Sequence, residues 1–108
     1  MPDFAAARSR LEKSLTELEE RLTHVVRDLD QPADADLAEQ AIELEDDEAL
    51  EHQAALITRE ITSVQQALRR IDGNTYSQCL GCGAEIASAR LEARPEAALC
   101  IRCARNRG

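Results

Sequence analysis

Four cysteines near the end of the chain have the spacing of a metal site. The 108-residue sequence holds two Cys-x2-Cys pairs with 17 residues between them, and the pairs are Cys79 with Cys82 and Cys100 with Cys103. Four thiolates at such spacing can complete the tetrahedral shell of one Zn²⁺ ion. Because a closed shell leaves no position for a water nucleophile, the pattern predicts a structural zinc and not a hydrolytic one.

Thiol redox chemistry at one of the pairs is the alternative to zinc. It is disfavoured because neither pair lies in a βαβ pattern and because two matched pairs are present. Elsewhere the sequence has no nucleophile–base arrangement and no phosphate loop, so we predict that the protein is not an enzyme.

The sequence also predicts where in the cell the protein is found. The start of the chain lacks the basic and apolar regions of a secretory signal. The sequence also contains no run of 18 apolar residues, which a membrane span would need. We therefore expect a cytoplasmic protein without membrane contact, in which a reducing environment favours metal binding over disulfides.

The charge is high and unevenly distributed. The formal net charge is −8, which should repel phosphate backbones, so direct binding to nucleic acid is not expected. Residues 28–51 include eleven acidic side chains and no Lys or Arg, whereas residues 79–108 include five Arg and three Glu. The sequence thus predicts an acidic segment and a mildly basic C-terminal end.

The elements that must position the cysteines are helical. Two sets of apolar residues recur with heptad spacing in residues 4–30, and together they form one stripe on a helix: Phe4, Leu11, Leu18 and Val25, with Leu15, Leu22 and Leu29. A second series follows the break at Pro32 and comprises Leu50, Ala54, Ile57, Ile61, Val64, Leu68 and Ile71. It stops at Gly73, which is expected to take the left-handed conformation of a helix end.

Two long stripes joined by a short break favour an antiparallel coiled-coil hairpin. Two separate helices in a globular bundle are the alternative, but the chain offers no third helix to complete one. We therefore predict a mainly α fold, with a coiled-coil hairpin over residues 1–72, an acidic tip near 31–41, and a small four-cysteine zinc-finger module over 73–108.

Within the tip, Asp36 and Glu39 have the spacing of a capping box. Asp36 would be the N-cap of the second helix and Glu39 its N3 residue, and both carboxylates suit the positive end of a helix dipole. Such a cap can also present a carboxylate to a partner. The charge of the tip therefore fits either a solvated end that discourages aggregation or a probe for a basic or metal-containing site.

Two stretches of the sequence resemble the DksA/TraR zinc-finger family of bacteria. One is the run from Arg90 to Pro95, Arg-Leu-Glu-Ala-Arg-Pro, with the second cysteine pair after it. The other runs from Ile71 to Tyr76 and into the first cysteine pair. The resemblance covers roughly residues 34–104 and implies a transcription regulator that binds RNA polymerase through its secondary channel and does not bind DNA.

The same resemblance gives roles to further residues. The family's tip motif, Asp-x-x-Asp-x-Ala, reads here as Asp36, Glu39 and Ala41, and it implies that the tip approaches the active site of the polymerase. Where family members use basic residues for joint binding of ppGpp, this chain has Ser63 and Ala104 and retains Arg94. We therefore expect weak or absent ppGpp synergy, with Arg94 as the candidate contact to ppGpp or to the channel rim.

Three functional hypotheses follow. The first is a DksA-like regulator of transcription initiation that contains one structural zinc. The second is a zinc-stabilised coiled-coil adaptor for another protein partner. The third is a thiol or zinc redox sensor, in which oxidation of the cysteines releases the metal.

Overall fold

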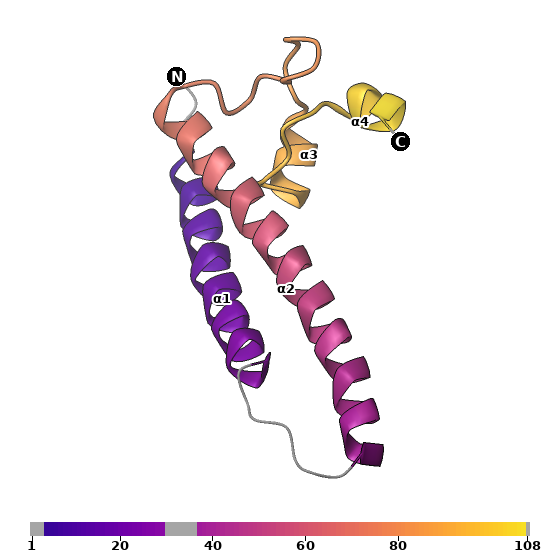
Figure 1. The fold of residues 1–108 in the computed structure, drawn as a ribbon. Coiled ribbons are helices and arrows are strands. Elements are labelled where there is room, and N and C mark those ends of the chain that lie inside the picture. The colour runs from indigo at the N-terminus through magenta and orange to yellow at the C-terminus, as the bar shows by residue number, and fades with distance from the viewer. Residues whose placement is uncertain (1–3, 30–36, 108) are drawn as a thin grey trace. The chain divides into compact units, whose positions relative to one another are not determined.

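The computed structural model describes residues 4–29 and 37–107, with only the backbone described for residues 37–46 and 107. The described residues form four helices: α1 (Ala5–Leu29), α2 (Leu37–Asp72), α3 (Ser88–Ala93) and α4 (Ile101–Arg107) (Figure 1). They contain no strand longer than one isolated antiparallel bridge between Gln78 and Glu85. Among these residues no helix is both long and apolar enough to cross a membrane. The mainly α class is confirmed.

The chain divides into two compact units. One comprises Thr16–Ile61, and the other comprises Met1–Leu15 together with Thr62–Gly108. Each long helix therefore contributes one part to each unit. The predicted domains, 1–72 and 73–108, instead divide the chain where the second long helix ends. That division stays a prediction.

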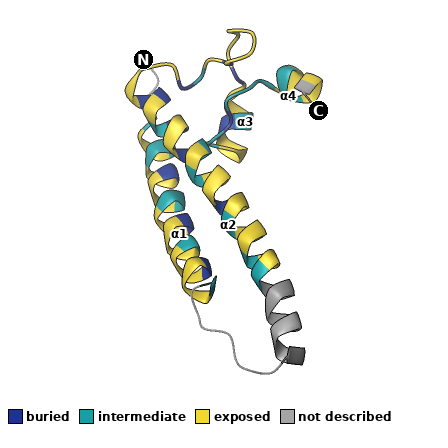
Figure 2. Ribbon diagram, in the orientation of Figure 1, coloured by how far each residue is buried: buried dark blue, intermediate teal, exposed yellow. Residues whose placement is uncertain are grey.

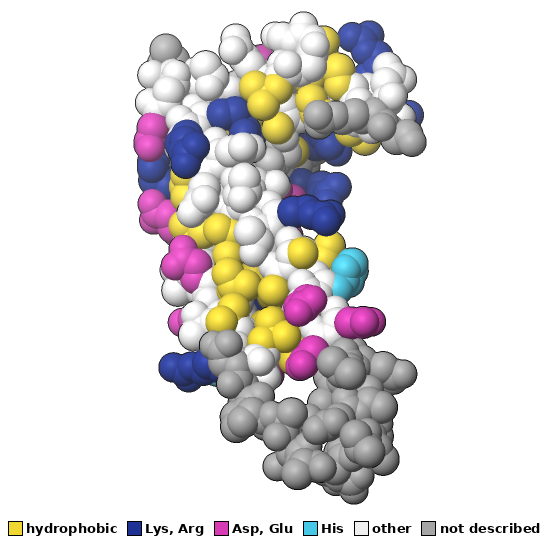
Figure 3. Space-filling view, viewed as in Figure 1, with side chains coloured by type: hydrophobic (Ala, Val, Ile, Leu, Met, Phe, Trp, Pro, Cys, Tyr) yellow, Lys and Arg dark blue, Asp and Glu magenta, His cyan; other side chains and the backbone are white. Residues whose placement is uncertain are grey.

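In the Thr16–Ile61 unit, α1 and α2 run antiparallel and pack through the predicted stripe (Figure 1). Leu18, Val25 and Ile57 are buried, and the second set of α1 is half-buried (Figure 2). Acidic side chains lie on either side of the hydrophobic stripe in the space-filling view (Figure 3). This is the pattern of a two-helix coiled coil, in which one stripe faces the partner helix and the other faces meet water.

In the second unit, α2 is buried on two faces. Leu11 of α1 packs with the continuing stripe of α2, whose Val64 and Ile71 are buried. Ala67 and Arg70 lie off that stripe, yet they are only 0% and 8% exposed. Residues of the C-terminal module cover this second face, since Arg70 hydrogen-bonds to main-chain oxygens of that module. The end of α2 thus belongs to both the hairpin and the module.

The end of α2 differs from the prediction at one residue. The left-handed conformation is found at Asn74, with φ of 60°, and not at Gly73, whose N–H still bonds to the oxygen of Arg69. The N–H of Asn74 bonds to Ile71 O at 3.2 Å, and that of Thr75 bonds to Arg70 O at 2.9 Å. This pair of bonds is a Schellman motif, in which asparagine is a common substitute for glycine at the left-handed position.

Candidate metal centre

The first cysteine pair lies in a tight hairpin after the end of α2. The N–H of Cys79 bonds to Ala84 O at 2.8 Å, and the N–H of Ile86 bonds to Ser77 O at 2.7 Å. Between these two bonds, the N–H of Gly83 donates a hydrogen bond to Cys79 O at 2.9 Å. These bonds turn the chain back on itself between Cys79 and Cys82.

The two glycines of this turn act in different ways. Gly83 has φ of 77°, a left-handed conformation that glycine adopts without steric cost. Gly81 is needed for space, because a Cβ atom there would lie 3.1 Å from the sulfur of Cys103. Gly83 therefore supplies backbone freedom to the turn, whereas Gly81 allows the two cysteine pairs to approach each other.

The second pair joins the first at the start of α4. The sulfur atoms of Cys79, Cys82, Cys100 and Cys103 all lie within 4.8 Å of one another, and all four cysteines are free. The sulfur atoms of Cys82 and Cys100 are 3.8 Å apart. A zinc–sulfur bond of about 2.3 Å gives a tetrahedron with an edge of about 3.8 Å. The four sulfur atoms therefore fit the shell of one Zn²⁺ ion.

The electrostatics of the cluster favour a divalent cation. The main-chain N–H groups of Cys100 and Gly81 each donate to the sulfur of Cys79 at 3.3 Å, and such bonds lower the pKa of Cys79 to about 6. Close contact with the sulfur atoms of Cys79, Cys100 and Cys82 raises the pKa of Cys103 to about 12. Four neighbouring thiolates repel one another, so without a cation the cluster keeps a proton, and a metal ion replaces it.

These pKa values predict that zinc binding at neutral pH releases protons, including the one that Cys103 holds. Below about pH 6, Cys79 is also protonated, and zinc must displace this further proton. The affinity of the site for zinc should therefore fall steeply as the pH decreases. Calorimetric zinc titrations in buffers of different ionisation enthalpy measure the protons released. Zinc binding without proton release at neutral pH would contradict this assignment.

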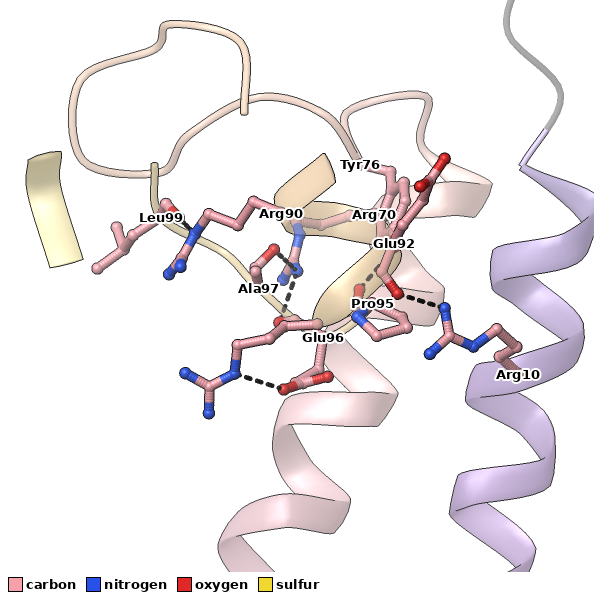
Figure 4. Close-up of polar contacts among 10 residues, drawn as sticks. Arg10, Arg70, Tyr76, Arg90, Glu92, Pro95, Glu96, Ala97 and Leu99 are labelled. Carbon is pink, nitrogen blue, oxygen red and sulfur yellow. Dashed lines mark hydrogen bonds and ion pairs between the residues drawn. The ribbon is translucent and has the colours of Figure 1, made fainter. Parts of the chain in front are cut away.

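Three side chains that the sequence alone does not identify as site residues bond to the main chain that precedes the second pair. Arg90 of α3 donates from Nε to Leu99 O at 2.8 Å, Tyr76 donates its hydroxyl to Pro95 O at 2.7 Å, and Arg70 donates to Ala97 O at 3.2 Å (Figure 4). Burial raises the pKa of Tyr76, so the phenol keeps the proton that it donates. These side chains hold the main chain that leads into Cys100.

The other predicted site residues are not among the four metal ligands. Asp36 is outside the described residues, and Glu39 and Ala41 lie in the first turns of α2, where only the backbone is described. Arg94 follows α3, and its exposed side chain forms an ion pair of 3.5 Å with Glu96. The roles of these residues stay predictions.

The fold and the cysteine cluster define a helical hairpin that is joined to a four-cysteine zinc finger. The family model of the DnaK suppressor protein-like N-terminal domain matches residues 8–71, and that of the prokaryotic dksA/traR C4-type zinc finger matches residues 74–107. The chain therefore belongs to the DksA/TraR family and has one structural zinc as its cofactor.

Curated relatives and solved structures agree with this family. The RNA polymerase-binding transcription factor DksA of Caulobacter vibrioides is 37% identical over 91 residues, which are 83% of this chain and 62% of the relative. The DksA of Escherichia coli strain K12 is 42% identical over 43 residues, which are 40% of this chain and 28% of that protein. This chain thus spans less than two thirds of the length of either relative.

Among solved structures, transcription factor DksA2 from Pseudomonas aeruginosa matches with a TM-score of 0.83 and 26% identity, over 99% of this chain and 90% of that one. The regulator Dks from Chlamydia trachomatis matches with a TM-score of 0.50 and 19% identity, over 97% and 91% of the two chains, and this likeness bears on the fold alone.

Proposed function

We propose that this protein binds RNA polymerase through its secondary channel and modulates transcription initiation without direct contact to DNA. The observation that carries the proposal is the 37% identity to a relative named as an RNA polymerase-binding transcription factor, over 83% of this chain. An antiparallel two-helix hairpin with one hydrophobic seam is suited to enter a narrow channel. The net charge of −8 disfavours a direct approach to DNA.

The two ends of the chain would have different tasks. The acidic tip, with Asp36, Glu39 and Ala41, would approach the active site of the polymerase and alter the stability of promoter complexes. Arg94 would contact the channel rim, because its ion pair with Glu96 is exposed and such pairs contribute only about 0–1 kcal/mol. A partner carboxylate can therefore replace Glu96 at little cost.

The metal would hold the structure and take no part in chemistry. Cys79, Cys82, Cys100 and Cys103 would bind the ion, and a shell of four thiolates leaves no site for a substrate or for water. A non-enzymatic regulator that acts in the cytoplasm is consistent with this donor set.

Joint binding of ppGpp is expected to be weak. Ser63, one of the uncharged replacements, lines a pocket with Leu80, Gly81 and Leu99, and no Lys, Arg or His lines it. A polyphosphate is held most strongly by the charged side chains of Arg and Lys, which this pocket lacks. Adding ppGpp should therefore change the effect of this protein on promoter complexes only slightly.

Promoter-complex lifetimes with purified polymerase test the proposal. We expect the zinc-loaded protein to bind polymerase, to compete with a known secondary-channel factor and to shorten the lifetimes. Asp36→Asn and Glu39→Gln should keep binding but lose most of the effect on lifetimes, whereas Glu60→Gln, an exposed change on α2 outside the tip, should behave as wild type. Binding with unchanged lifetimes would reject regulation, and no competition for the channel would favour the adaptor hypothesis.

A further inference from the structure

The segment that joins α3 to the second cysteine pair is held almost entirely through its carbonyl groups. In this connecting segment, residues 95–99, all five main-chain oxygens accept hydrogen bonds from outside the segment. Their donors are the Tyr76 hydroxyl, the Arg70 guanidinium for two oxygens, the Leu80 N–H and the Arg90 Nε. Figure 4 shows the side-chain donors reaching toward the segment from separate elements.

Arg70 has a special place among these donors. It comes from the last turn of α2, and its NH2 group donates to Ala97 O at 3.2 Å and to Glu96 O at 3.4 Å. Its side chain is 8% exposed, and its Nε is buried without a hydrogen-bond partner among the described residues. Burying a guanidinium with one N–H unsatisfied is costly, so the position is not explained by stability alone.

The connecting segment leads directly into the metal site. Cys100 follows Leu99, and the N–H of Cys100 donates to the sulfur of Cys79 at 3.3 Å. The N–H of Leu80, within the first cysteine pair, bonds to Ala98 O at 2.9 Å. A shift of the segment would therefore move Cys100 and weaken a hydrogen bond to Cys79, so both cysteine pairs depend on where it lies.

We propose that Arg70 is a positioning residue for the zinc site, because it fixes the connecting segment that sets the place of Cys100. The interaction links the helical hairpin to the metal, since the donor lies on α2 and the acceptors lie next to the second cysteine pair. The inference is independent of polymerase binding and concerns the affinity of this chain for zinc. Groups that orient metal ligands in this way typically change metal affinity by about 10- to 100-fold.

The test is zinc competition against a chromophoric chelator, with the rate of zinc release recorded on the same samples. Arg70→Met keeps an unbranched, flexible side chain and removes the donors, and it should weaken zinc binding by about 10- to 100-fold and speed release. Arg70→Lys keeps a cationic donor and should recover part of the affinity. Arg69→Met changes the same residue type one position away on the exposed surface and should match wild type.

A purely structural role predicts a different result. It would lower the unfolding midpoint of the helices in zinc-saturated protein, whereas a positioning role leaves that midpoint nearly unchanged, because methionine packs well and removes a buried charge. If Arg70→Met does not fold, Arg70→Lys decides, since it keeps the charge but alters the bonds to Glu96 O and Ala97 O and should still bind zinc more weakly and release it faster than wild type. Wild-type affinity and release rate in the variant that is measured would overturn the proposal.

Discussion

Replacing Cys79 by serine should abolish stable zinc binding and unfold the C-terminal module, while the helices of the Thr16–Ile61 unit remain folded. Structural zinc contributes about 10–16 kcal/mol of apparent binding free energy in small zinc-finger peptides. The net stability of a whole domain is only about 5–15 kcal/mol. The module has two short helices of 6 and 7 residues, too short to be stable alone in water.

Among the four cysteines, Cys79 is the one at which a substitution should be most disruptive. It is 3% exposed, and its sulfur accepts two main-chain hydrogen bonds, one from each cysteine pair. Serine would remove a metal ligand and leave a smaller oxygen in that place. Hydrogen exchange resolved by residue should show loss of protection from residue 79 to residue 104, and excess chelator should have the same effect on wild type.

Gln78→Ala supplies the control, because Gln78 is exposed and only its main chain takes part in the bonds around the first pair. This variant should retain one zinc per chain and a wild-type exchange pattern. Unchanged thermal stability of the zinc-free Cys79→Ser protein would show that the module folds without its metal.

The second large effect is expected at Tyr76, whose replacement by alanine should lower the free energy of unfolding by about 3–5 kcal/mol. Tyr76 is 1% exposed, and its ring meets that of Phe4 edge to face at a centroid distance of 4.8 Å. Removing it leaves a cavity between the start of α1 and the module, and it removes the hydroxyl bond to Pro95 O as well.

Tyr76→Phe separates the two contributions. It keeps the ring contact and deletes only the hydroxyl, so it should cost about 1 kcal/mol, the usual net value of one hydrogen bond. Urea unfolding of zinc-saturated samples measures both variants. If alanine and phenylalanine gave equal losses, the ring contact with Phe4 would contribute nothing measurable.

The sequence was sufficient to predict the hairpin and the cysteine cluster, because both rest on local spacing. Heptad repeats define the buried stripe through Leu11, Leu18 and Val25, and two Cys-x2-Cys pairs define the metal ligands whatever the loop between them does. Family membership, suggested by the run from Arg90 to Pro95, is confirmed by the matches to both parts of the chain.

What could not be predicted depends on contacts between distant parts of the chain. Arg69 and Arg70 are identical neighbours outside the heptad stripe, and only the module that packs on α2 makes one buried and leaves the other exposed. Gly73 was the natural choice for the left-handed residue, but the helical bonding of α2 continues one residue further, so Asn74 takes that conformation. The tip residue Asp36 lies outside the described residues.

The contacts of α1 with the end of α2 and with the C-terminal module have a consequence for protein synthesis. Arg8 pairs with Asp72 across 64 residues, and Arg10 donates to Glu92 O across 82 residues. The start of α1 is therefore synthesised long before the residues that it contacts. Since contacts of such long range form slowly, this unit should assemble only after the second cysteine pair has left the ribosome, with capture of zinc among its last steps.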